Sequence, residues 1–277
     1  MIGVATTAIR YNSKELLELM DFYSEDLTRE NQEDSTSVVR TVLRYGSIEM
    51  IEVLSTLGVT FDHEYNDQYT DVMVAVDRGD VAVIEKLDML GVDVAKPNNQ
   101  GLTPIIMAAR SGDINSLEVL FRILKQKKID PEIQEYLGGN LLLHAAYENQ
   151  PEVLTKVQDL GMDINKPNKI GITPIHASVK NGGVDSIYKL VEMGANIHGE
   201  DSEGQTLVLL AIDGGQRESL KALKELNIDL DYVNKDDITG LMYAIQHEKI
   251  DMVKCLHELG ADFNKIVSVL SSSVISA

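Results

Sequence analysis

The sequence predicts an all-α solenoid of stacked helix–turn–helix units with a period of 33 residues. Threonines recur at that spacing from Thr70 to Thr103 and from Thr173 through Thr206 to Thr239. A Leu-Gly-x-Asp type motif recurs with the same period, at residues 57–59, 90–93, 160–165, 193–197 and 259–264. Aromatic residues make up 5% of the chain and Trp is absent, which favours an aliphatic core between helices. Because one such unit cannot bury its apolar side alone, a shared period predicts stacking.

Each unit is expected to contain two helices, and local signals place their ends. In Thr173-Pro174 the threonine can cap a helix N-terminus, and the proline fits a first turn that requires no amide donor. Gly46 and Gly79 fall where the first helix ends, since glycine tolerates the positive φ of a helix stop. An apolar stripe at helical spacing over residues 81–90 predicts the second helix, which Gly91 ends in the same way.

The clearest copies of the motif are Gly171-Ile172-Thr173-Pro174-Ile175-His176-Ala177 and, at residues 101–109, Gly-Leu-Thr-Pro-Ile-Ile-Met-Ala-Ala. Together with Gly-Ala-Asp-Phe-Asn at residues 260–264, they resemble the ankyrin-repeat family. The pattern of that family is Gly-x-Thr-Pro-Leu-His-x-Ala-Ala, followed later by Gly-Ala-Asp-Val-Asn. The resemblance covers nearly the whole chain. It implies an ankyrin-repeat solenoid with β-turn finger tips that binds another protein.

The period divides the chain into about eight units. Residues 1–31 are expected to form a degenerate N-terminal capping repeat, and residues 32–266 an array of about seven repeats. The array carries a four-residue insertion near residues 125–136, and its next unit has a register uncertain by one residue, so that His144 lies at or beside the histidine slot. Residues 267–277 form a C-terminal tail or an unfinished repeat.

Charge and composition narrow the classes of partner. The formal net charge is −19, from 25 Lys+Arg against 44 Asp+Glu, which disfavours phosphate backbones and anionic membranes. The acidity serves solubility or, alternatively, attracts a basic partner. The single cysteine, Cys255, permits neither an intrachain disulfide nor a cysteine-rich zinc site. No stretch approaches the roughly 18–20 apolar residues that span a bilayer. We therefore expect a cytoplasmic protein that binds neither nucleic acid nor membrane.

Motifs that carry chemistry are scarce. His176 occupies the histidine slot of the family pattern and is expected to hydrogen-bond the adjacent turn, and Cys255 is expected to be a small buried hydrophobe. Residues 229–240 fail as a calcium loop, because Asn234 stands where glycine is needed and Gly240 where glutamate is needed. Phosphate-binding, dinucleotide-binding and nucleophile-elbow motifs do not occur. The sequence therefore predicts no enzyme, and no metal, cofactor or small-molecule substrate.

The resemblance implies that a partner lies on the concave face, just before each repeated threonine and just after the small residues of the first helix. Carried over unit by unit, the predicted binding residues are Tyr69, Asp77, Arg78, Leu102, Arg110, Tyr147, Ile170, Ile172, Lys180, Gln205, Asp213 and Ile238. Within this set, tyrosine, leucine and isoleucine form an apolar strip flanked by Arg78, Arg110 and Lys180. Tyrosine and arginine are enriched among binding hot spots. The alternative is that these residues fill the packing between neighbouring tips.

Two functions of different class follow. The first is an interaction module (a scaffold, adaptor or inhibitor) that binds a folded or peptide partner. The second is the ankyrin portion of a larger polypeptide, such as a channel, an enzyme or a secreted microbial effector, in which the repeats position another functional domain. The mass of the native protein distinguishes them, since a value near 30.6 kDa excludes the larger polypeptide.

Overall fold

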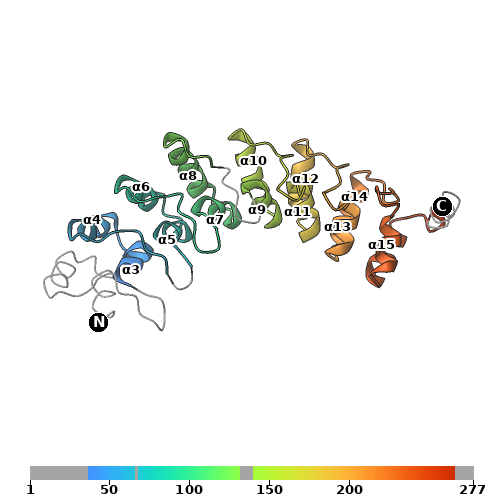
Figure 1. Cartoon of the computed structure of the whole chain (residues 1–277), viewed down its shortest axis with the longest axis horizontal. Helices are drawn as coiled ribbons and strands as arrows, with labels where there is room; N and C mark the ends of the chain where they lie inside the picture. Colours follow the sequence, from blue (N-terminus) through green and yellow to red (C-terminus); the bar gives the residue numbers. More distant parts are fainter. Residues whose placement is uncertain (1–36, 66–67, 132–139, 266–277) are drawn as a thin grey trace. The chain divides into compact units, whose positions relative to one another are not determined.

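The computed structural model of this chain describes residues 37–65, 68–131 and 140–265 (Figure 1). These residues form seven consecutive helix pairs, and their only β pairing is an isolated bridge between Glu64 and Thr70. The helices are α3 (Val38–Tyr45), α4 (Ile48–Thr56), α5 (Asp71–Arg78), α6 (Val81–Met89), α7 (Pro104–Ser111), α8 (Ile114–Gln126), α9 (Leu141–Tyr147), α10 (Pro151–Asp159), α11 (Pro174–Asn181), α12 (Val184–Glu192), α13 (Leu207–Asp213), α14 (Arg217–Glu225), α15 (Gly240–Gln246) and α16 (Ile250–Glu258). The predicted all-α repeat fold is confirmed.

The chain divides into two compact units. Among the described residues, unit 1 contains 37–108 and 113–131, and unit 2 contains 109–112 and 140–265. In unit 1, α3 packs on α5, and α6 packs on both α4 and α8. In unit 2, the first helices α9, α11, α13 and α15 form one stack, and the second helices α10, α12, α14 and α16 form another. The predicted N-terminal cap and C-terminal tail lie outside the described residues.

A capping residue sets the start of every first helix. The side chains of Ser37 and Asn140 accept the backbone N–H three residues later, at 3.0 and 2.9 Å. The same position is held by Thr70, Thr103, Thr173, Thr206 and Thr239. This position satisfies amide donors that lack a partner inside the helix. Because Asn140 is the cap, Leu143 occupies the histidine slot and His144 lies one residue beyond it.

Glycine ends several helices in the expected way, with one exception. Gly79 and Gly91 take φ values of +69° and +82°, in the left-handed region that favours glycine. The prediction of a positive φ at Gly46 was wrong: its backbone is extended, with φ −80°. A Cβ there would approach the Val42 carbonyl oxygen to 2.7 Å, so close packing against α3 is what requires glycine.

The second helices vary in length at one place only among the described pairs. Helix α8 has 13 residues, whereas α4, α6, α10, α12, α14 and α16 have nine each. The difference of four equals the excess over two periods between Thr103 and Thr173. The four additional residues are therefore accommodated as one more helical turn of α8.

The core of each unit is aliphatic. In unit 1, Leu54, Ile84 and Leu120 are fully buried, as are Ile187 and Leu223 in unit 2. Burying one such side chain contributes about 1.5–3 kcal/mol. Cys255 is also fully buried, which confirms its predicted role as a small hydrophobe. Within the residues described, none of the helices is long and apolar enough to cross a membrane.

Candidate partner-binding surface

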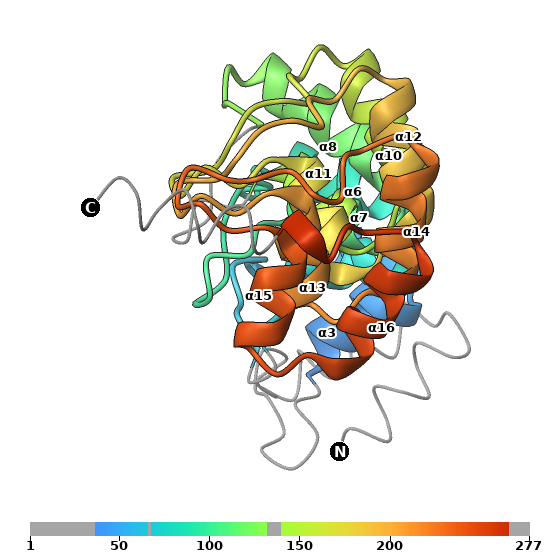
Figure 2. The same cartoon turned by 90° about the vertical axis from the view of Figure 1, so that its right-hand side faces the viewer.

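The loop before each first helix is a tight hairpin organised by one Asx side chain. In unit 2, Asn168 Oδ1 accepts the backbone N–H groups of Ile170 and Ile172 at 3.0 and 2.9 Å. Asp201 and Asn234 do the same in the next two repeats, and Asn98 does so in unit 1. This is the local reason that Asn or Asp recurs here, since an Asx side chain can replace a backbone turn. In Figure 2 the hairpins of unit 2 lie on the side away from α10, α12 and α14.

Four of the predicted residues occupy one equivalent position, the last residue of the hairpin. In each of them the backbone N–H donates to the Asx oxygen and the side chain is half-buried. They are Leu102 in unit 1 and Ile172, Gln205 and Ile238 in unit 2. Partial burial gives these side chains a share in packing as well as an exposed part that a partner can contact.

Ile170 lies at the outer position of its hairpin and is 56% exposed. The equivalent residues of the other Asx hairpins are the polar Gln100, Glu203 and Asp236. Ile170 also supports the next repeat through its backbone, because its carbonyl oxygen accepts the Ser202 hydroxyl at 2.6 Å. An isoleucine held outward by a fixed backbone is therefore a distinctive feature of this hairpin.

The C-terminal ends of the first helices in unit 2 carry contacts that link one repeat to the next. Lys180 Nζ lies 3.0 Å from Asp213 Oδ2, and Arg110 Nη2 lies 2.9 Å from Glu148 Oε1. The Asn181 amide donates to the Tyr147 carbonyl oxygen at 2.6 Å. The predicted charged residues of this unit are therefore already paired between repeats, while Tyr147 remains 49% exposed.

Unit 1 uses its predicted charged residues in the same way. Arg78 Nη1 donates to the carbonyl oxygens of Leu43 and Gly46 at 3.2 and 2.7 Å, and so closes the C-terminal end of α3. Asp77 pairs with Arg44 at 2.5 Å. Tyr69 is half-buried, and its ring centroid lies 5.9 Å from the Arg40 guanidinium carbon.

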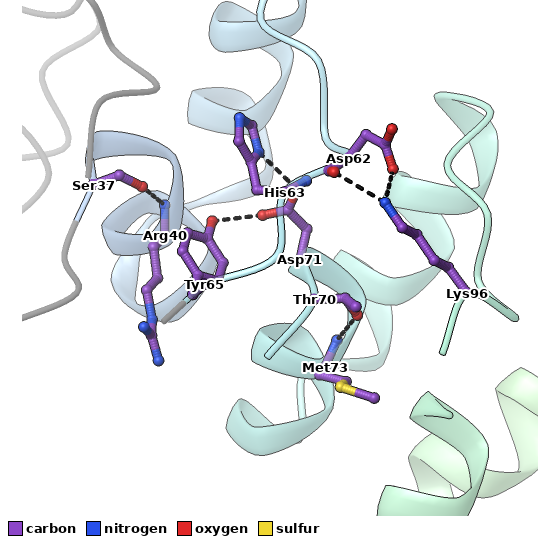
Figure 3. A network of polar contacts seen from close by, with 9 residues as sticks. All are labelled: Ser37, Arg40, Asp62, His63, Tyr65, Thr70, Asp71, Met73 and Lys96. Carbon is purple, nitrogen blue, oxygen red and sulfur yellow. Dashed lines mark hydrogen bonds and ion pairs between the residues drawn. The ribbon is translucent and has the colours of Figure 1, made fainter. Parts of the chain in front are cut away.

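A polar cluster in unit 1 was not anticipated from the sequence (Figure 3). Asp71, the first residue of α5, is 1% exposed. Its Oδ2 accepts the backbone N–H and the ring Nδ1 of His63, both at 2.9 Å, and its Oδ1 accepts the Tyr65 hydroxyl at 2.6 Å. The Arg40 guanidinium lies over the Tyr65 ring, 4.7 Å from the centroid.

This cluster shifts the titration of its members. The hydrogen bond to Asp71 raises the pKa of His63 above its usual value, and burial raises the pKa of Tyr65. All three donors to Asp71 come from the segment that leads into α5, so the carboxylate fastens that segment to the helix. A signal existed in the sequence, because Asp71 is an acidic residue at a position that an apolar residue or glycine holds in the other described first helices.

His176 bears out its predicted structural role. Its Nδ1 accepts the Thr173 N–H at 3.1 Å, which leaves Nε2 to donate to the Gly199 carbonyl oxygen at 3.2 Å. Burial lowers the pKa of His176, and a proton on Nδ1 would abolish the bond from Thr173. The side chain therefore works as a neutral linker between a helix start and the following hairpin.

No His, Cys, Asp or Glu group of three or more is placed to hold a metal ion in the described ranges 37–65, 68–131 and 140–265. The features of this surface are instead those of a protein-binding face. Hairpin tips and helix ends hold exposed apolar side chains on a backbone fixed by Asx turns, caps and ion pairs between repeats. Such an arrangement defines a helical repeat protein built to present a surface.

Comparison with known proteins agrees with this arrangement. The sequence matches the family of ankyrin repeats (3 copies) over residues 72–168, 142–234 and 175–266, which together span well over half of the chain. The chain belongs to the ankyrin-repeat family, whose repeats are non-enzymatic modules that bind other proteins. No curated protein matches the sequence.

Among solved structures, the fold is similar to the crystal structure of the ankyrin repeat domain of Bcl-3, described as a unique member of the IkappaB protein family. The TM-score is 0.62 at 20% sequence identity, and the alignment covers 81% of this chain and 100% of that one. At this identity the similarity establishes the fold and nothing about the partner.

Proposed function

We propose that this protein is an interaction module, acting as a scaffold, adaptor or inhibitor, whose partner binds the hairpin tips and the first-helix ends of unit 2. The observation that carries the proposal is the exposure of two large apolar side chains, Tyr147 and Ile170, on this face. Their charged neighbours Lys180 and Asp213 are engaged with each other. Exposed apolar side chains on a rigid backbone lose little conformational entropy on binding, so they suit a protein partner.

The cytoplasm is the compartment we propose for this module. The support is compositional: one cysteine, which is buried as a free thiol, fits a reducing environment. The net charge of −19 supports a role for electrostatic attraction in recruiting the partner, and salt weakens such attraction.

The test is capture of partners by the immobilised chain from extract of its source cells, at low and high salt. A double variant, Tyr147→Ala with Ile170→Ser, is compared with a matched control, Tyr188→Ala with Ile250→Ser. The control removes two exposed apolar side chains from the second helices α12 and α16 of the same unit. Circular dichroism establishes that both variants fold.

We expect the parent and the control to retain the same protein, and the Tyr147/Ile170 variant to lose at least nine-tenths of it, as roughly 1.4 kcal/mol per tenfold change implies for two hot-spot residues. Retention by that variant equal to the parent, or loss by the control variant, contradicts the proposed face.

A further inference from the structure

A cavity of about 150 Å³ opens in unit 2 at the base of two successive hairpins. Its walls come from the segment after α12, the start of α13 and the segment after α14. The apolar lining consists of Ile197, Leu207, Val208, Ile228 and Tyr232, and the polar rim includes His198, Thr206, Asn227 and Asp229. None of the twelve residues predicted for the partner surface lines it.

Two departures from the repeat pattern explain why the cavity lies here. Lysine recurs at one position after the second helix, as Lys96, Lys166 and Lys265, and the equivalent residue of this repeat is Gly199. Lys96 reaches back to pair with Asp62 of the preceding repeat. At Gly199 there is no side chain to cover the space between the hairpins.

The second departure is the loss of a bond between hairpins. Asn165 Oδ1 accepts the Asn196 N–H at 2.8 Å, and Asp231 accepts the Asp262 N–H at 3.0 Å. At the cavity, the residues at the equivalent two positions are His198 and Asp229. No such bond joins these two residues in the described part of unit 2. The two segments are therefore not tied together at the mouth of the cavity.

The charge around the mouth is strongly negative. The flanking segment 196–205 contains three acidic residues, and 227–237 contains four, against the single lysine Lys235. Asp229 lies at the rim itself, with its Oδ2 3.9 Å from Lys265 Nζ, and the whole chain carries −19. A low-dielectric hollow rimmed by one sign of charge concentrates ligands of the opposite sign.

We infer that this cavity is a docking pocket for a basic peptide segment of a partner protein, which inserts one aliphatic side chain between flanking lysines or arginines. The cavity volume suits the insert, since a void of about 150 Å³ accepts a benzene-sized group. The exposed Tyr232, 50% accessible, forms a wall on which the stem of a flanking lysine or arginine can lie. The pocket is a second contact, beyond the proposed binding face.

The test uses the full chain, isotope-labelled, and an acetylated heptapeptide probe, Lys-Arg-Ser-Leu-Ser-Arg-Lys, titrated by NMR. Two comparison peptides replace the central leucine by alanine or all four basic residues by glutamate. We expect amide shifts concentrated at residues 197–199 and 227–232. The alanine peptide should bind at least tenfold more weakly, because it leaves three carbon atoms unburied, and the glutamate peptide should not bind.

Asp229→Asn removes the rim charge, and with it the long ion pair to Lys265 at 3.9 Å, but keeps the side-chain oxygen that accepts the Asp231 N–H at 2.9 Å. Asp163→Asn is its matched control, because Asp163 Oδ1 accepts the Asn165 N–H at 2.9 Å at the equivalent position two repeats earlier. We expect a two- to fivefold loss of affinity for Asp229→Asn and none for the control. Tyr232→Ala should lower affinity by about fivefold or more.

Equal affinity of the leucine and alanine peptides overturns the inference, as does an equal effect of Asp163→Asn and Asp229→Asn. Shifts spread over the acidic surface would also overturn it, since they indicate attraction without a pocket. The probe does not require the Tyr147 and Ile170 face, so a variant lacking those side chains should bind it normally. The two proposals can therefore fail independently.

Discussion

The Asp71 carboxylate offers the sharpest test of how unit 1 is held together. In Asp71→Asn the shape is kept, but only one oxygen remains to accept three donors, and the new amide faces a donor. If the remaining oxygen accepts the two His63 donors, the amide donates to the Tyr65 hydroxyl oxygen, and the hydroxyl proton loses its acceptor. The bond that Tyr65 donates to the carboxylate is therefore lost and the two bonds from His63 lose their charged acceptor, so we expect the segment to be less stable by about 2–4 kcal/mol.

Amide hydrogen exchange measured by mass spectrometry on peptides covering residues 61–76 is the suitable assay. Repeat proteins can open locally, and a global denaturation curve would average the effect over the array. A loss of about 2–4 kcal/mol corresponds to protection roughly 30- to 900-fold lower in this segment. Peptides from unit 2 should be unchanged, since they share no contact with Asp71 among the described residues.

The matched control is Asp77→Asn, which removes a carboxylate from the same helix. Asp77 pairs with Arg44 at the surface, where an ion pair contributes about 0–1 kcal/mol. We expect protection in the control to stay within about fivefold of the parent. If Asp71→Asn also stays within that range, or if Asp77→Asn matches it in effect, the fastening role assigned to Asp71 is wrong.

Four further predictions concern individual residues or pairs. Burial lowers the folded-state pKa of His176, so its contribution to stability is present above pH 6.5 and is lost as the pH falls from 6.5 toward the lowered value. Hydrogen exchange of residues 173–179 at a series of pH values measures this loss. His63 should behave oppositely, since Asp71 raises its pKa: its contribution is complete below pH 6.5 and is lost as the pH rises through the folded-state value. Exchanging Lys180 and Asp213 should restore most of the small loss, about 0.2–1 kcal/mol, that either charge reversal causes in hydrogen exchange of residues 174–181 and 207–213. Gly182→Ala should cost about 1–2 kcal/mol in the same assay, because its φ is +80°.

Matched variants test two of these predictions. His176→Gln should flatten the pH dependence of exchange near residue 176, and an unaltered profile contradicts the assignment. Gly183→Ala is the matched control for Gly182, because its φ is −77° and a Cβ there meets atoms no closer than 3.2 Å. If the two alanine variants are equally stable, backbone strain is not the reason for glycine at position 182.

Much of the fold follows from the sequence, because its signals are local. A cap side chain bonds an amide three residues away, and an Asx side chain organises its own hairpin, so Thr173 and Asn168 act within a few residues of themselves. The 33-residue period then places the same cap and the same hairpin in successive repeats. The exception at Gly46 is informative, because packing against α3 and not the backbone angle of a helix stop requires glycine there.

The repeat therefore determined by itself the class of protein, the helix pairs and the positions that we predict to face a partner. Only the tertiary structure decided which of those positions are already engaged. Lys180 finds Asp213 33 residues later, and Arg78 finds backbone carbonyl groups of the preceding repeat. Likewise, the cavity beside Gly199 exists because Ile228 and Tyr232 of the next repeat form its other wall. These outcomes depend on which side chains two neighbouring repeats bring within hydrogen-bonding or packing distance. The sequence pattern of one repeat does not give the distances between side chains of different repeats.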